Sequence, residues 1–314
     1  MKFSELKKHL ANDALKPAYL LSGDDEYLFL SALKFFRGTV SNFPEINISI
    51  HEGTSDVKKI LEDLESAPLA SPHRLVIVNG FKGDFKLFEK YLKSPNPSSV
   101  LVVCSKDIKE TLKKIQPLFE TVDCSRVDEK FIRAFIGKIL NEYGSSIEEN
   151  ALRLLLDYTN HYMFAISTNI EKLALLKMNS VITLDDVKNN VPASYDFKIY
   201  ELSDAIAKGE KEKISNIILS LYADKMPSST LMSLVYSHFR RLLYCAITSG
   251  ETKELGEYLG VKEFAISKYL AQSKKYSVKT LKEIVDKFHE LDFNIKSGKI
   301  EADIAFELFV TMPL

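Results

Sequence analysis

Cysteine is scarce in this 314-residue chain and tryptophan is absent. The three cysteines are scattered and form no CxxC pair; they are Cys104, Cys124 and Cys245. This excludes the small secreted scaffolds that disulfides hold together. We therefore expect a protein of a reducing, cytoplasmic compartment.

Long apolar runs are also missing. A membrane-spanning helix needs about 20 consecutive apolar residues, whereas the runs here are as short as Val100–Cys104 and Leu242–Ile247. The first residues, Met1–Leu6, lack the charged-then-apolar order of a signal peptide. We expect neither a membrane partner nor a secretory leader.

The chain has no excess of one charge and few of the residues that break regular structure. Its 42 basic and 43 acidic side chains leave a net charge of −1, so it lacks the basic surplus of an autonomous nucleic-acid binder. Twelve glycines and ten prolines exclude collagen-like and low-complexity classes. With 46% hydrophobic residues, the chain can build the cores of two or three domains.

A phosphate-binding loop is absent where one would be expected. The first strand candidate ends at Ser22-Gly23, and no GK[ST] follows. Asp24, Asp25 and Glu26 would repel a triphosphate there, and they suit a helix N-terminus instead. We expect no ATP binding or hydrolysis; an unrecognised P-loop NTPase is the alternative interpretation.

Other catalytic and metal-binding patterns are missing too. The six histidines show no metal-ligand spacing with one another or with cysteine, and neither a GxSxG nor a Cys/His motif occurs. We therefore predict no catalytic residue, no metal and no cofactor. The basic run Lys274-Lys275-Tyr276 could contact phosphates, although a solvated helix face is the favoured interpretation.

Alternating strand and helix signals fill the first 126 residues. Short apolar, β-branched runs predict strands at residues 17–21, 46–50, 74–78, 99–103 and 121–124. Helical spacing predicts helices at residues 26–37, 57–64, 85–92 and 108–118. Buried strands separated by helices indicate a parallel sheet covered on both faces, an α/β domain of the nucleotide-binding kind.

Strand signals stop after residue 127, and the rest of the chain is predicted to be helical. Residues 127–195 form a small helical domain in which Thr183 caps a helix, and residues 192–194 are the best linker candidate. Residues 196–314 form a second helical domain, with an amphipathic stripe from Val278 to Ile295.

Six motifs, in order along nearly the whole chain, resemble the delta-subunit family of bacterial DNA polymerase III. They lie at residues 19–28, 67–78, 170–187, 197–206, 238–243 and 291–298, with Glu307 beyond the last. The first motif has G-D-D-E where true ATPases have the phosphate loop. Each motif is moderately specific, and together they make the resemblance strong.

The resemblance implies an AAA+-like fold and a mechanical role without catalysis. Residues 1–126 would be a clamp-binding α/β domain without a phosphate loop, residues 127–195 a helical lid, and residues 196–314 a helical collar for oligomerisation. The expected partners are the beta sliding clamp, the delta-prime and gamma/tau clamp-loader subunits, and primed DNA within the complex. The subunit would open the clamp ring in the replisome, as a non-catalytic part of a nucleotidyltransferase holoenzyme.

The resemblance also implies a clamp contact at Pro68, Leu69 and Ala70, on the approach to the third strand. Family members often carry an aromatic residue beside the leucine, and this chain has none. A leucine between Pro and Ala suits a partner pocket; alternatively, Leu69 packs under its own helix. A delta-prime subunit is a further alternative, although Cys124 precedes Ser125-Arg126 where that subunit has Ser-Arg-Cys. The last alternative is a helical scaffold protein unrelated to replication.

Overall fold

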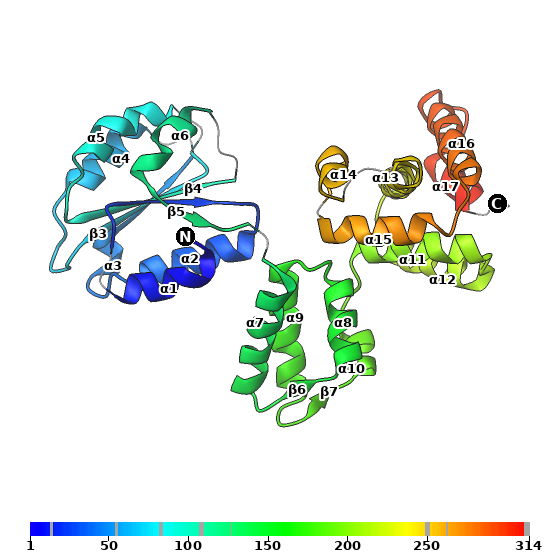
Figure 1. Cartoon of the computed structure of the whole chain (residues 1–314), viewed down its shortest axis with the longest axis horizontal. Helices are drawn as coiled ribbons and strands as arrows, with labels where there is room; N and C mark the ends of the chain where they lie inside the picture. The colour runs from blue at the N-terminus through cyan, green and yellow to red at the C-terminus, as the bar shows by residue number, and fades with distance from the viewer. Residues whose placement is uncertain are drawn as a thin grey trace. The chain divides into compact units, whose positions relative to one another are not determined.

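Five short strands form one parallel sheet in the computed structural model of the protein (Figure 1). The order across the sheet is β2-β3-β4-β1-β5, and every neighbouring pair runs parallel. The strands are β1 (Ala18–Ser22), β2 (Ile48–Glu52), β3 (Arg74–Asn79), β4 (Ser99–Ser105) and β5 (Glu120–Asp123). The predicted fold class, a parallel α/β sheet followed by helices, is confirmed.

The structure describes residues 1–12, 15–53, 56–81, 84–106, 110–125, 127–248, 252–261 and 263–310. The chain divides into two compact units, Met1–Asn190 and Val191–Leu314. This division lies next to the linker expected at residues 192–194. The further division of the first unit after residue 126 stays a prediction.

Helices bury both faces of the sheet, because successive side chains of a strand point to opposite sides. Tyr19 and Leu21 of β1 pack with α1 (Phe3–Ala11) and α2 (Glu26–Arg37). Ala18 and Leu20 pack on the other side with α4 (Val57–Glu65), α5 (Glu89–Lys93) and α6 (Glu110–Ile115). Figure 1 shows the two helical layers on either side of the strands.

Three details of this α/β part differ from the sequence prediction. The helix expected at residues 85–92 starts as a 3-10 turn, η1 (Phe85–Phe88), and only then becomes α5. The helix expected at residues 108–118 is broken into α6 and a second 3-10 turn, η2 (Gln116–Leu118), and its first two residues lie outside the described ranges. Helix α1 was not predicted, and the short α3 (Pro44–Asn47) includes the first two residues of the strand expected at residues 46–50, so β2 starts at Ile48.

The rest of the first unit is helical, with one small exception. Its helices are α7 (Glu129–Glu142), α8 (Glu149–Tyr158), α9 (Met163–Leu176) and α10 (Leu184–Asn190). The expectation of no strand after residue 127 is wrong, because β6 (Ser146–Ile147) pairs in parallel with β7 (Val181–Ile182). Thr183 caps α10 as predicted: its Oγ1 accepts the Asp186 N–H at 3.4 Å, and Asp186 Oδ2 accepts the Thr183 N–H at 2.9 Å.

The second unit is built from helices around α13 (Ser228–Ile247). The others are α11 (Tyr195–Lys208), α12 (Lys211–Ala223), α14 (Thr252–Leu259), α15 (Glu263–Ser273), α16 (Val278–Lys296) and α17 (Ala302–Val310). Leu231, Val235, Phe239 and Leu242 line the buried face of α13 at helical spacing. Leu281, Ile284 and Phe288 of the predicted α16 stripe join the same core.

Candidate functional site

The predicted contact residues lie on the loop that joins α4 to β3. Helix α4 ends at Glu65, where the Ser66 N–H donates to the Glu62 carbonyl. Leu69 then has 54% of its surface exposed, and Ala70 takes a left-handed backbone with φ of 49°. Pro68 is half-buried. The alternative in which Leu69 packs under its own helix is therefore wrong, and the leucine is free to meet another molecule.

The side chain of Asn47 holds this loop in place through hydrogen bonds. Its side chain is fully buried, and its amide accepts the Leu69 N–H at 2.8 Å and donates to the Leu69 carbonyl at 2.9 Å. The same Nδ2 donates to the carbonyls of Asn42 and Phe43 at 2.9 and 3.2 Å. Asn42 in turn donates from its own amide to the Ala70 carbonyl at 2.9 Å. Residues 42–47 and 66–71 thus form one hydrogen-bonded surface, here called the two-loop platform.

The sequence prediction missed one apolar residue of this platform. Phe43 precedes α3, is 51% exposed and has a φ of 47°. Sequence reasoning placed no element there, because a lone phenylalanine between Asn42 and Pro44 has no periodic partner. The Asn-Phe-Pro sequence was the available signal, since proline favours the first position of a helix.

Polar contacts of His73 and Arg74 fix the end of the loop that leads into β3. His73 Nε2 lies 2.9 Å from Thr39 Oγ1, and burial lowers the pKa of His73. Arg74 donates to Ser49 Oγ at 2.9 Å and to Asp63 Oδ1 at 3.1 Å, which ties β3 to β2 and to α4. The exposed leucine therefore stands on a loop whose two ends are both anchored.

The turn between β1 and α2 is built against the end of β5. Gly23 has a φ of 144°, and a Cβ placed on it would lie 2.2 Å from the Cys124 carbonyl carbon. The Asp25 N–H donates to the Cys124 carbonyl at 3.1 Å, and Asp25 Oδ1 accepts the Leu28 N–H at 3.2 Å. The predicted helix N-terminus is confirmed, and its cap is a carboxylate where a nucleotide-binding loop would present N–H groups to a phosphate.

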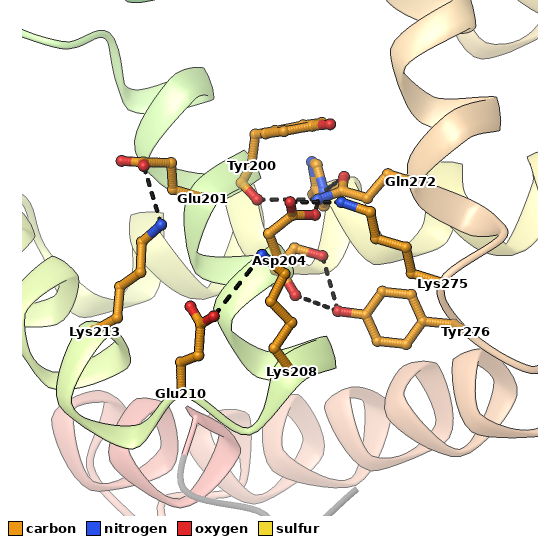
Figure 2. A network of polar contacts seen from close by, with 11 residues as sticks. Tyr200, Glu201, Asp204, Lys208, Glu210, Lys213, Gln272, Lys275 and Tyr276 are labelled. Atoms are coloured by element: carbon orange, nitrogen blue, oxygen red, sulfur yellow. Dashed lines mark hydrogen bonds and ion pairs between the residues drawn. The ribbon is translucent and has the colours of Figure 1, made fainter.

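Residues from separate motifs meet in a polar network of the second unit (Figure 2). Gln272 of α15 donates to Asp204 Oδ1 at 2.7 Å and to the Tyr200 carbonyl at 3.0 Å, both on α11. Lys275 Nζ lies 2.6 Å from Asp204 Oδ2. The buried His238 Nε2 lies 2.8 Å from Gln272 Oε1. The network joins α11, α13 and α15, and its members bond to one another, which makes it a structural element of the unit.

Reactive chemistry finds little support among the described residues. They contain no group of three or more His, Cys, Asp or Glu side chains placed to hold a metal ion. Burial raises the pKa of both Cys104 and Cys124 to about 12, so neither thiol is a nucleophile at neutral pH. None of the described helices combines the length and the apolar character that a bilayer span requires.

Two family models match the chain. The model of the DNA polymerase III delta subunit matches residues 19–126, and the model of that subunit's C-terminal domain matches residues 196–312. A DNA polymerase III subunit delta from Bacillus subtilis is 26% identical, over 96% of this chain and 94% of that protein. A probable subunit delta from Aquifex aeolicus is 23% identical, over 58% of this chain and 54% of that protein.

A solved structure has the same fold. The DNA clamp loader delta protein of Bacillus subtilis superposes with a TM-score of 0.70, covering 98% of each chain at 23% sequence identity. At this identity the match shows the fold alone: a parallel sheet with helices in the first unit and helices in the second.

Proposed function

The chain belongs to the DNA polymerase III delta subunit family, and from that premise we propose that it binds the beta sliding clamp and opens the ring for loading onto primed DNA. The observation that carries the proposal is the exposed Leu69, 54% accessible on a loop anchored at both ends. Exposure of a leucine has no benefit for folding, because burial is what stabilises apolar side chains. Insertion of Leu69 into an apolar pocket of a partner would bury this exposed surface.

The anchoring of the loop supports a mechanical role. A rigid apolar anchor loses little conformational freedom on binding, so more of its contact energy remains to distort the partner. The Asn47 amide and the Thr39–His73 pair supply this rigidity. Opening a closed ring requires such a rigid anchor. A flexible loop would adapt to the clamp surface and would transmit no strain to the interface between the clamp subunits.

The division of labour follows the three predicted parts. In this proposal residues 1–126 bind the clamp through Pro68, Leu69 and Ala70, residues 127–195 form the lid, and residues 196–314 form the collar. The collar joins the delta-prime and gamma/tau subunits, and ATP hydrolysis belongs to the gamma/tau subunits. The acid-capped turn at Asp25 supports a subunit that works without a nucleotide of its own.

The test is the affinity of the full chain for its cognate sliding clamp, with Leu69→Ala beside the wild type. Burying a leucine buries roughly 100 Å² of apolar surface, worth about 2.5 kcal/mol. We expect the variant to bind about tenfold to a hundredfold more weakly, with an unchanged melting temperature. Leu87→Ala is the matched control, because Leu87 is a 55% exposed leucine of the same unit that lies outside the platform.

A second readout follows ring opening directly, by energy transfer between two dyes placed across one clamp interface. The wild type should open the ring without ATP, and Leu69→Ala should fail at concentrations where Leu87→Ala succeeds. Wild-type protein that leaves the clamp unbound would overturn the proposed function. A Leu69→Ala variant with normal affinity would remove Leu69 from the contact.

A further inference from the structure

Phe43 is an exposed apolar residue with a strained backbone. Its φ of 47° is a left-handed conformation that bulky side chains rarely adopt. Its side chain gains little from burial in return, because 51% of the residue is exposed. Strained residues persist where the surroundings over-determine them, and they gather at functional sites.

The surroundings of Phe43 do over-determine its backbone. Its carbonyl accepts the Ile46 and Asn47 N–H groups, each at 3.0 Å, which starts α3. The Asn47 side-chain amide adds a third donor at 3.2 Å. Pro44 fixes the first position of the helix. These three donors and Pro44 fix the Phe43 backbone, while 51% of the residue stays exposed.

Phe43 and Leu69 share one support. The Asn47 Nδ2 atom donates to both of their carbonyls, at 3.2 and 2.9 Å, so the two backbones meet at a single nitrogen. Their sequence neighbours are all uncharged: Asn42, Pro44, Pro68 and Ala70. With Ile46, which is 45% exposed, the platform carries three exposed apolar side chains, and Glu45 is the one charged residue in its two segments. This composition matches the apolar centre of a protein interface.

We propose that Phe43 is a second contact residue for the sliding clamp, and that it docks beside Leu69 into an apolar pocket on the clamp surface. This inference rests on the proposed function. The clamp is the occupant because the platform is continuous: any partner seated on Leu69 meets residues 42–47, to which that loop is hydrogen bonded. The aromatic surface missing beside Leu69 in the sequence is then supplied from a neighbouring loop.

The test compares full-length variants at position 43 for affinity to the cognate clamp. Phe43→Asn removes the ring, and asparagine tolerates the left-handed backbone. We expect it to weaken binding by about tenfold or more, from the apolar area lost, with an equal or higher melting temperature. Phe43→Tyr keeps the aromatic surface and should bind within about threefold of the wild type. Phe164→Ala, at a 48% exposed phenylalanine on α9, is the matched control and should bind normally.

The outcomes separate this inference from the proposed function. Weaker binding by both Phe43→Asn and Leu69→Ala supports both. Weaker binding by Leu69→Ala with normal binding by Phe43→Asn overturns the role of Phe43 and leaves the proposed function standing. Failure of the wild type to bind the clamp overturns both. If Phe43→Asn instead abolishes self-association of the chain in sedimentation, with clamp affinity unchanged, the occupant is a second copy and the inference is wrong.

Discussion

Among single residues, His238 shows how burial controls charge. It lies 4% exposed in the core of the second unit, and burial lowers its pKa from 6.5 to about 4. The hydrogen bond to Gln272 opposes this shift, and the charges of Arg241 and Asp204 act on it in opposite directions. The folded protein therefore keeps the imidazole neutral at pH 7, whereas the unfolded chain takes up a proton near pH 6.5.

This difference predicts acid sensitivity. Between pH 6.5 and about 4 the unfolded state binds more protons than the folded state. The contribution of neutral His238 to the free energy of unfolding is therefore fully present above pH 6.5 and falls as the pH falls through that window. Lowering the pH from 7.5 to 5 should cost roughly 2 kcal/mol of unfolding free energy from His238, at about 1.4 kcal/mol per pH unit below 6.5. Urea denaturation at the two pH values measures it.

His238→Gln is the control for this prediction, because glutamine does not titrate. Its unfolding free energy should vary less with pH than that of the wild type. His73, whose pKa burial also lowers, contributes equally to both proteins and cancels in the comparison. Identical pH dependence of the two proteins would show that the folded state accommodates the protonated His238.

Secondary-structure elements were predictable where one periodicity ran long enough to be read. The strands β3 and β4 are continuous buried runs, and α2 and α16 carry regular apolar faces, so the residues alone located them. The strands β6 and β7 have only two residues each, which is too short for any period. Such elements form because the helices around them bring their backbones together.

The candidate site was predictable only in part, for a similar reason. Leu69 stood out because of its place before a strand and the family resemblance. Asn47 acts through hydrogen bonds to Leu69, 22 positions away, and through the same side-chain amide to the nearby Phe43 carbonyl. Local sequence carries no trace of such a contact. The same holds for His238 and Gln272, which are 34 positions apart.

Asn47 gives a prediction at the scale of these elements, since it joins the start of α3 to the loop after α4. Asn47→Ala leaves the Leu69 N–H and three carbonyls without this partner, which should cost about 1–3 kcal/mol of stability. The Leu69 amide should exchange slowly with solvent in the wild type, despite its exposed side chain, and quickly in the variant. Hydrogen exchange followed by mass spectrometry measures this.

Asn42→Ala is the matched comparison, because the bonds of the Asn42 side chain are exposed: it donates to the Ala70 carbonyl at 2.9 Å and accepts from Ser41 Oγ at 3.5 Å. Its effect on stability and on Leu69 exchange should be much smaller. Equal exchange of the Leu69 amide in the wild type and in Asn47→Ala would show that the loop is held by something other than the buried amide.

The whole molecule consists of two units with separate cores. The first unit, Met1–Asn190, buries both faces of its sheet, and the second, Val191–Leu314, packs around α13. A unit with its own core can fold alone. Residues 1–190 and 191–314, expressed as separate fragments, should therefore each unfold in one cooperative transition.

The fragments should also divide the proposed activities. We expect residues 1–190 to bind the sliding clamp with nearly full affinity, because the platform lies wholly within that unit. Residues 191–314 should assemble with the other clamp-loader subunits and leave the clamp unbound. Calorimetry and clamp titration of each fragment provide the measurements, and a folded first fragment that has lost clamp binding would contradict the assignment.

The position of β1 in the sheet also matters while the chain is being made. β1 lies between β4 and β5, so both of its neighbours leave the ribosome after it, the nearer one about 80 residues later. At about 5–20 residues per second this is a delay of roughly 4–16 s. Throughout that time Tyr19, Leu20 and Leu21, all fully buried in the finished protein, have no strand to pair with. Nascent chains of this protein should therefore depend on chaperones that cover apolar segments until β4 emerges.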